Sequence, residues 1–142
     1  MLEINYKNFE IDCREIFGKY LLEYNFKEIH DEVLEFEKIY ENEFWKIEIS
    51  MISNFPHIGI SFEFISKENG YIKNSVLEEL LGIDRKKNIE IHDRLFNKEY
   101  YNKSSNEQYK IEMIFCVEIL ELSYTQLLIG NFTYSDYKNY IQ

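Results

Sequence analysis

The sequence contains few of the residues that support phosphate-binding loops and covalent cross-links. It has 5 Gly and 1 Pro among 142 residues, whereas a glycine-rich nucleotide loop needs several closely spaced glycines. Its 2 cysteines, Cys13 and Cys116, are far apart and form no CxxC pair. Glycine-loop nucleotide sites, disulfides and cysteine-based metal sites are therefore disfavoured, and both thiols are predicted to be reduced core residues in a reducing compartment.

Long apolar runs and positive charge are also scarce. No stretch approaches the roughly 18 uncharged apolar residues of a membrane span, and residues 1–5 lack the basic start and apolar core of a signal peptide. There are 16 basic and 26 acidic residues, a formal net charge of -10. Binding to nucleic acid or to an anionic membrane would work against this charge. The sequence predicts a cytoplasmic protein, with a basic protein as its charged partner and no nucleic-acid or membrane partner.

Apolar and aromatic residues, in contrast, are plentiful. Hydrophobic residues make up 45% of the chain and aromatic residues 17%, with 12 Tyr and 11 Phe. This composition excludes intrinsic disorder, which needs low hydrophobicity together with high net charge. A chain of this length can bury one core, so residues 1–142 are predicted to form a single domain.

Helices are predicted where apolar residues recur at steps of three and four. Residues 6–24 show this spacing, and so do residues 104–130, which open with a Ser104–Glu107 capping box. A short helix is expected over residues 75–82, because Ser75 and Glu78 have capping-box spacing and Gly82 suits a C-terminal left-handed position.

Two further segments are predicted less directly. A short C-terminal helix is expected up to Ile141, with Ser135 as its N-cap. Residues 84–103 are basic and weakly periodic, so we expect an irregular connector with room for a short helix or strand between residues 89 and 96.

Strands are predicted where the apolar period changes to two. Residues 45–51 and 58–64 alternate between apolar and polar side chains, and residues 33–40 also read as extended. Asn69–Gly70 favours a tight turn into a brief fourth strand. Since the links are short, the strands must form an antiparallel meander. The side chains expected to face the helices are Trp45, Ile47, Ile49, Ile60, Phe62 and Phe64, and those expected to face outward are Lys46, Glu48, Ser61 and Glu63.

These elements together predict an α+β fold. The order is an N-terminal helix, a three- or four-stranded antiparallel meander, a short helix, a long helix and a short C-terminal helix. The helices are expected to pack on one face of the sheet.

No catalytic, metal or cofactor motif stands out. His30–Asp31–Glu32 and His92–Asp93 place imidazole beside carboxylate, but neither has the i, i+4 histidine spacing of a helical zinc site. No serine lies in a GxSxG elbow. Although Arg14 follows Cys13, neither cysteine is expected to be a reactive thiolate, because both fall on apolar helix faces. We therefore expect a protein that is not an enzyme, with no cofactor and no metal.

Acidic residues concentrate in residues 27–48. This stretch holds 8 acids and 3 bases, a net of -5, whereas residues 84–110 hold 5 acids and 7 bases, a net of +2. One interpretation is a solvated outer sheet face that keeps the protein soluble. The other is a docking surface for a basic partner, in which acids steer the approach and exposed aromatics hold the complex. The residues proposed for this surface are Glu35, Glu37, Tyr40, Glu41, Glu43 and Phe44.

Two more aromatics, Phe36 and Trp45, are expected to be exposed beside these acids. For Trp45 this conflicts with its predicted core position. Phe44 is therefore the substitute anchor, on the opposite face of the strand. The basic stretch is too diluted by acids to predict a nucleic-acid site.

The whole chain resembles, in general style, small acidic immunity-type proteins that bacteria carry against polymorphic or contact-delivered toxins. The resemblance rests on the opening helix over residues 6–24, on the aromatic-rich segment 44–49, and on the run 127–132 with Tyr134 and Tyr137 after it. It implies a non-catalytic protein that neutralises one cognate toxin by occlusion.

The sequence therefore leaves three alternative functions open. The first is an interaction protein, of immunity type, that binds a basic partner through the acidic segment. The second is a small-ligand-binding or regulatory module with a Tyr/Phe-lined pocket between sheet and long helix. The third is a hydrolase whose carboxylates or histidines converge only in three dimensions.

Overall fold

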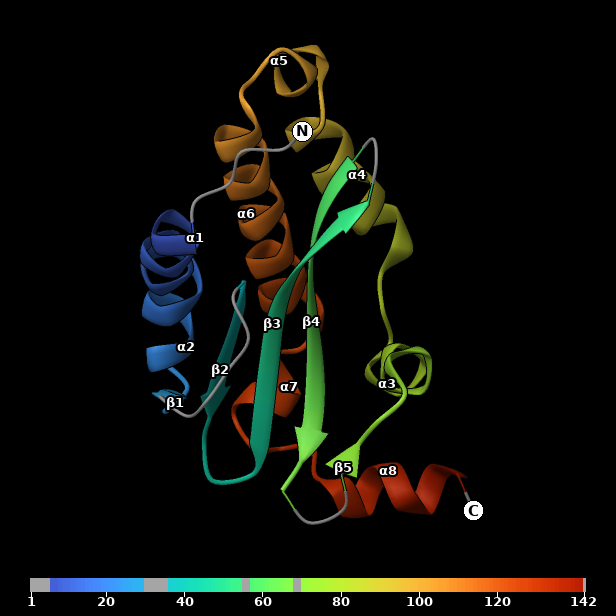
Figure 1. Ribbon diagram of the computed structural model, residues 1–142. Coiled ribbons are helices and arrows are strands. Elements are labelled where there is room, and N and C mark those ends of the chain that lie inside the picture. The colour runs from blue at the N-terminus through green and yellow to red at the C-terminus, as the bar shows by residue number, and fades with distance from the viewer. Residues whose placement is uncertain (1–5, 30–35, 55–56, 68–69, 142) are drawn as a thin grey trace.

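The computed structural model describes residues 6–29, 36–54, 57–67 and 70–141 (Figure 1). The chain begins with a helical run of three parts, continues through an antiparallel sheet, and ends in six helices. The elements are α1 (Tyr6–Cys13), the π-helical segment η1 (Arg14–Gly18), α2 (Lys19–Leu22), β1 (Lys27–Ile29), β2 (Glu37–Glu41), β3 (Trp45–Asn54), β4 (His57–Ser66), β5 (Gly70–Tyr71), α3 (Asn74–Leu81), α4 (Arg85–Leu95), α5 (Lys98–Tyr101), α6 (Ser105–Ser123), α7 (Thr125–Leu128) and α8 (Tyr134–Ile141).

The sheet is an antiparallel meander in the order β1-β2-β3-β4-β5. Its centre is the long β3–β4 pair, in register from Trp45 opposite Ser66 to Asn54 opposite His57. The two-residue β5 is the predicted fourth strand, and β1 is a short edge strand that the sequence pattern did not indicate. The predicted α+β fold, with an antiparallel meander and helices packed against it, is confirmed.

The predicted N-terminal helix is confirmed as the run α1–η1–α2, which ends at Leu22. The predicted long helix is α6. As expected, Ser104 caps it by accepting a hydrogen bond from the Glu107 amide at 3.3 Å. It ends at Ser123 and not near Gly130, because Tyr124 leaves helical geometry before the separate turn α7.

Three local predictions are wrong. Ser75 lies inside α3, whose N-cap is Lys73 with no side-chain hydrogen bond, although Gly82 does end the helix in the left-handed region. Helix α8 begins at Tyr134, before the predicted N-cap Ser135. The amide and hydroxyl of Thr133 both donate to the Asp136 carboxylate there, which closes the first turn.

The third error concerns residues 84–103, which are largely helical. Asp84 caps α4 by accepting from the Lys87 amide at 3.1 Å, and Asn97 caps α5 by accepting from the Glu99 and Tyr100 amides. These caps satisfy amides that the first turn of a helix leaves without partners. They outweigh the weak apolar periodicity of the segment.

The core lies between one face of the sheet and the helices. Ile47, Ile49 and Phe64 are fully buried, and Ile60 and Phe62 pack against the same cluster, as the alternation predicted. Cys13 and Cys116 are also buried, which raises the pKa of each thiol to about 12. In Figure 1, α6 and α7 lie behind the strands, and no described helix crosses the front of β2, β3 and β4.

Candidate functional site

The uncovered side of the sheet, called here the open face, carries two of the four acidic side chains proposed for docking, Glu37 and Glu41. Residues of adjacent strands that lie opposite each other point to the same side of a sheet. Glu48 lies opposite both Ile39 and Glu63, and Glu37 lies opposite Ser50. Four carboxylates therefore share the open face: Glu37, Glu41, Glu48 and Glu63.

Three of these carboxylates form one cluster. Glu48 and Glu63 are directly opposite each other on β3 and β4, a placement that is unfavourable for like charges. The pKa of Glu37 is raised by partial burial and by the negative charges of Glu48 and Glu63. The cluster is thus a locus of negative potential within the described part of the chain.

The remainder of the open face is closer to neutral. Glu41 pairs with Lys67 at 3.7 Å and lies opposite Lys46 on β3. The hydroxyls of Ser50 and Ser61 lie 3.2 Å apart across β3 and β4. Among the described residues of the open face, the negative charge is therefore concentrated at Glu37, Glu48 and Glu63.

Part of that acidic segment is used inside the fold. Glu28 lies opposite Tyr40 and so on the helix-covered side. It accepts from Arg14 at 2.9 Å and lies 3.2 Å from the buried ammonium of Lys38. Lys38 also pairs with Glu10 at 3.1 Å. These groups hold α1 and η1 to the sheet edge, so Glu28 does not contribute to the open face.

The expectation that aromatics beside the acids are exposed is wrong for Tyr40 and Trp45, and Phe36 is half-buried. Tyr40 is 3% exposed, and its hydroxyl points to the Cys13 sulfur at 3.9 Å. Trp45 is 1% exposed, and Phe36 packs edge-on against Phe9. The two-residue period places Tyr40 and Trp45 on the core side, and this outweighs their proximity in sequence to the acids. Tyr40 is therefore no docking residue.

The two other docking candidates, Glu43 and Phe44, lie in the β2–β3 turn. Phe44 is 43% exposed, but it lies in the turn and not on the strand face opposite Trp45. Its ring packs on Gly130, where an added Cβ would lie 2.9 Å from Phe44 Cε2. Glu35 lies outside the described residues. Of the six predicted residues, the structure brings only Glu37 and Glu41 together on the open face.

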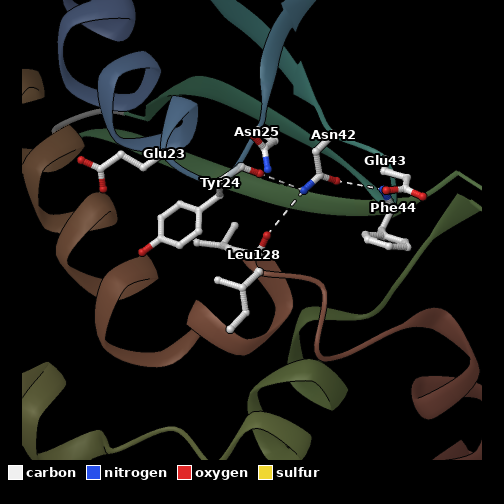
Figure 2. Close-up of a pocket in the computed structure, with 8 residues that line it drawn as sticks. Glu23, Tyr24, Asn25, Asn42, Glu43, Phe44 and Leu128 are labelled. Atoms are coloured by element: carbon white, nitrogen blue, oxygen red, sulfur yellow. Dashed lines mark hydrogen bonds between the residues drawn. The ribbon is translucent and has the colours of Figure 1, made fainter.

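Asn42 fixes the turn that presents Glu43 and Phe44 (Figure 2). Its Oδ1 accepts from the Phe44 and Trp45 amides at 2.9 and 2.8 Å. Its Nδ2 donates to the carbonyls of Tyr24 and Leu128 at 3.4 and 3.5 Å. One side chain thus ties the hairpin to the end of the first helical run and to α7.

Beside this turn is a small hollow of about 190 Å³, lined in part by Glu23, Tyr24, Asn42, Glu43 and Phe44. Small-molecule sites usually enclose roughly 300–1,000 Å³. The hollow is therefore better suited to one side chain of a partner than to a free ligand.

A larger groove lies on the other side of the sheet, between β4 and helices α4, α5 and α6. It consists of two adjoining hollows of about 390 and 330 Å³, which share Ile60, Phe115 and Cys116 as lining residues. Tyr100 and Tyr101 line the first hollow, and Tyr124 lines the second. This is the Tyr/Phe-lined pocket that the ligand-binding alternative requires, and we call it the aromatic groove.

Among residues 6–29, 36–54, 57–67 and 70–141, no group of three or more His, Cys, Asp or Glu side chains could hold a metal ion. His92 is exposed on α4, with Nδ1 at 3.3 Å from the Asp93 carboxylate. His30, Asp31 and Glu32 lie outside the described residues.

Sequence reasoning missed Glu48 and Glu63 as parts of one cluster. Alternation indicated that both face outward, but only the strand register shows that they are direct neighbours. It also missed Glu112, which lines the aromatic groove, because a lone glutamate on a long helix carries no distinguishing pattern.

Comparison with known proteins yields no relative. No protein-family model matches the chain, and no curated protein or solved structure shows significant similarity. In the part of the chain that the structure describes, no helix is long and apolar enough to cross a membrane. The fold and its surface define the class: an α+β protein with one helix-covered and one open sheet face.

Proposed function

We propose that this protein is a non-catalytic interaction protein that binds a basic protein partner through the open face. The observation that carries the proposal is the cluster of Glu37, Glu48 and Glu63 on a sheet face that no described helix crosses. A partner that places lysine or arginine against this cluster relieves repulsion among the carboxylates.

The electrostatics of the cluster support rapid capture of such a partner. A concentrated negative patch on a protein of net charge -10 attracts a basic surface over several ångströms and raises the association rate. Partner binding would lower the raised pKa of Glu37, because a nearby cation favours the charged carboxylate. The interaction should therefore weaken as the pH falls toward the ordinary pKa range of a carboxylate.

The resemblance to immunity-type proteins suggests which kind of basic partner this protein binds. The partner would be a cognate toxin in the bacterial cytoplasm, and binding would occlude it. In such a role the protein needs a rigid charged surface and no reaction of its own.

The proposal is tested by capture from an extract of the organism's own cells, with three forms of the protein as bait. The first is wild type, and the second carries Glu48→Lys and Glu63→Lys. The third, the matched control, carries Glu90→Lys and Glu121→Lys, two exposed positions on α4 and α6 with the same change in net charge.

We expect wild type and control to retain the same basic protein and the open-face variant to lose it. Mass spectrometry identifies what is retained, and circular dichroism checks that each variant is folded. The proposal fails if wild type retains no basic protein, or if the control variant loses the partner as completely as the open-face variant does.

A further inference from the structure

We propose that the aromatic groove binds a small organic amine, with its ammonium group against Glu112 and its apolar part along β4. This inference is independent of the open face, because the groove lies on the helix-covered side of the sheet. It gives the ligand-binding alternative a chemical class of ligand.

The first hollow gathers aromatic rings from three helices. The ring centroid of Phe96 lies 4.7 Å from that of His92, 4.8 Å from that of Tyr100 and 5.3 Å from that of Phe115. Tyr101 adds a ring that is 62% exposed at the mouth. Aromatic ring faces attract organic cations within about 6 Å of their centres. Such a set of rings therefore favours an ammonium group over a neutral or anionic one.

Glu112 supplies the complementary charge. It lines the same hollow, and its Oε2 is buried without a hydrogen-bond partner. Burial raises the pKa of Glu112 to about 7, and a hydrogen bond with the Tyr100 hydroxyl offsets part of that rise. A buried carboxylate oxygen without a donor is costly, so an ammonium that donates to Oε2 gains more than it would at the surface.

The second hollow points to the same class of ligand by a separate route. It is lined by apolar groups that include Phe62, Ile119 and Tyr124, and by the acidic residue Glu78 of α3. Asn88 also lines it, and its Oδ1 is buried with no hydrogen-bond partner. Both unpartnered atoms of the groove are acceptors, which a carboxylate or phosphate ligand could not satisfy. An amine with an apolar body places its ammonium against Glu112 in the first hollow and its apolar part in the second.

Ligand binding should be coupled to release of a proton. The titratable groups that line the first hollow with Glu112 are His92 from α4, Tyr100 and Tyr101 from α5, and Cys116 from α6; the β4 lining, Gly59 and Ile60, has none. Since a bound ammonium favours ionised Glu112, amine affinity should rise between about pH 6 and pH 8.

The test is a titration of the full chain with phenethylamine, followed by protein-observed NMR and calorimetry. Its matched probes are 2-phenylethanol, which is neutral, and 3-phenylpropionate, which is an anion. We expect the amine to bind at least about tenfold more tightly than either, with affinity rising from pH 6 to pH 8. Equal binding of amine and alcohol, or no binding of the amine at concentrations up to about 10 mM, overturns the proposal.

Variants then locate the site. Glu112→Gln preserves shape and should weaken amine binding about tenfold and remove its pH dependence. Tyr101→Ala should weaken it several-fold, whereas Tyr140→Ala, an exposed tyrosine on α8, should leave it unchanged. Unchanged binding in both Glu112→Gln and Tyr101→Ala contradicts the assignment.

Two further measurements separate this proposal from the open-face proposal and from binding of a protein lysine in the groove. The Glu48→Lys/Glu63→Lys variant should bind the amine as wild type does, so that failure of the open-face proposal leaves this result intact. Nα-acetyl-lysine methylamide should bind more weakly than phenethylamine. If it binds more tightly, the groove takes a protein lysine and the small-amine assignment is wrong.

Discussion

At the residue scale, Gly130 is the position where backbone and side chain constrain each other most sharply. Its φ is +84°, and an added Cβ would lie 2.9 Å from the Phe44 ring. Gly70 has a similar φ of +87° with nothing within 4 Å of an added Cβ. Gly130→Ala should therefore cost about 1 to 2 kcal/mol of backbone strain plus a steric term, and Gly70→Ala only the strain.

Urea denaturation of the two variants measures this difference. The double variant Gly130→Ala/Phe44→Ala should recover the steric part, because it removes the ring that the new methyl group meets. Equal losses of unfolding free energy at Gly130 and Gly70 would show that Phe44 does not pack there as described.

Asn42 is a second residue whose removal should lower the stability of the protein. Asn42→Ala removes two acceptor bonds and two donor bonds that join the β2–β3 turn to Tyr24 and Leu128. We expect a loss of about 1 to 3 kcal/mol in unfolding free energy, since backbone groups, most of them partly buried, lose their side-chain partners. Asn102→Ala, at an exposed position after α5, should stay within about 0.5 kcal/mol in the same denaturation assay. Similar values for both would contradict the role of Asn42.

The sequence could predict which side of a strand a residue faces, but not which residues become neighbours. Alternation placed Ile49 and Glu63 on opposite sides, as the structure shows. It could not pair Glu48 with Glu63, because strand register depends on loop geometry. Exposure of Tyr40 was mispredicted for a related reason: sequence proximity to acids was given more weight than strand period.

The placement of Ile49 on the core side and Glu63 on the open face predicts different effects of mutation on stability. Ile49→Ala should cost about 2 to 5 kcal/mol by truncating a fully buried side chain. Glu63→Gln should be neutral or slightly stabilising, because it removes a like charge opposite Glu48. Urea midpoints measure both, and a larger loss for Glu63→Gln than for Ile49→Ala would mean that the two faces have been exchanged.

At the element scale, strongly periodic segments were predictable and a weakly periodic one was not. The helix over residues 6–22 and α6 each present an apolar stripe to the sheet, and the Ser104 cap also marked the start of α6. Helix α4 has no fully buried residue. Its helical state depends on the Asp84 cap and on contacts with α6, which no local pattern reveals.

The same limit explains why the aromatic groove was expected only in outline. Its walls come from β4, α3, α4, α5 and α6, and two of these elements, α4 and α5, lie in the segment expected to be irregular. The structure shows that Tyr100 is buried and that Tyr101 stands at the mouth of the groove.

At the scale of the whole molecule, stability should depend on pH through Glu112. Its pKa in the folded state, about 7, lies above the ordinary value of 4.5 for an exposed glutamate. The folded state therefore binds this proton more tightly than the unfolded state does. The resulting contribution is fully present below about pH 4.5 and is lost as the pH rises through about 7.

Glu112→Gln removes this dependence, since glutamine stays neutral at every pH. Relative to that variant, wild type should lose unfolding free energy between pH 5 and pH 8, as measured by urea denaturation at both values. A wild-type protein that gains stability relative to Glu112→Gln over this interval would contradict the burial of the carboxylate.

The central claim is that the open face directs association with a basic protein, and the most direct measurement is the association rate as a function of salt. The protein captured by wild type is purified, and its association rate with wild type, Glu48→Lys/Glu63→Lys and Glu90→Lys/Glu121→Lys is measured by stopped flow at low and high ionic strength. We expect the open-face variant to associate at least about tenfold more slowly at low salt and with a flatter salt dependence than the control. Equal association rates and equal salt dependence for the two variants would show that only net charge matters and that the open face is not the docking surface.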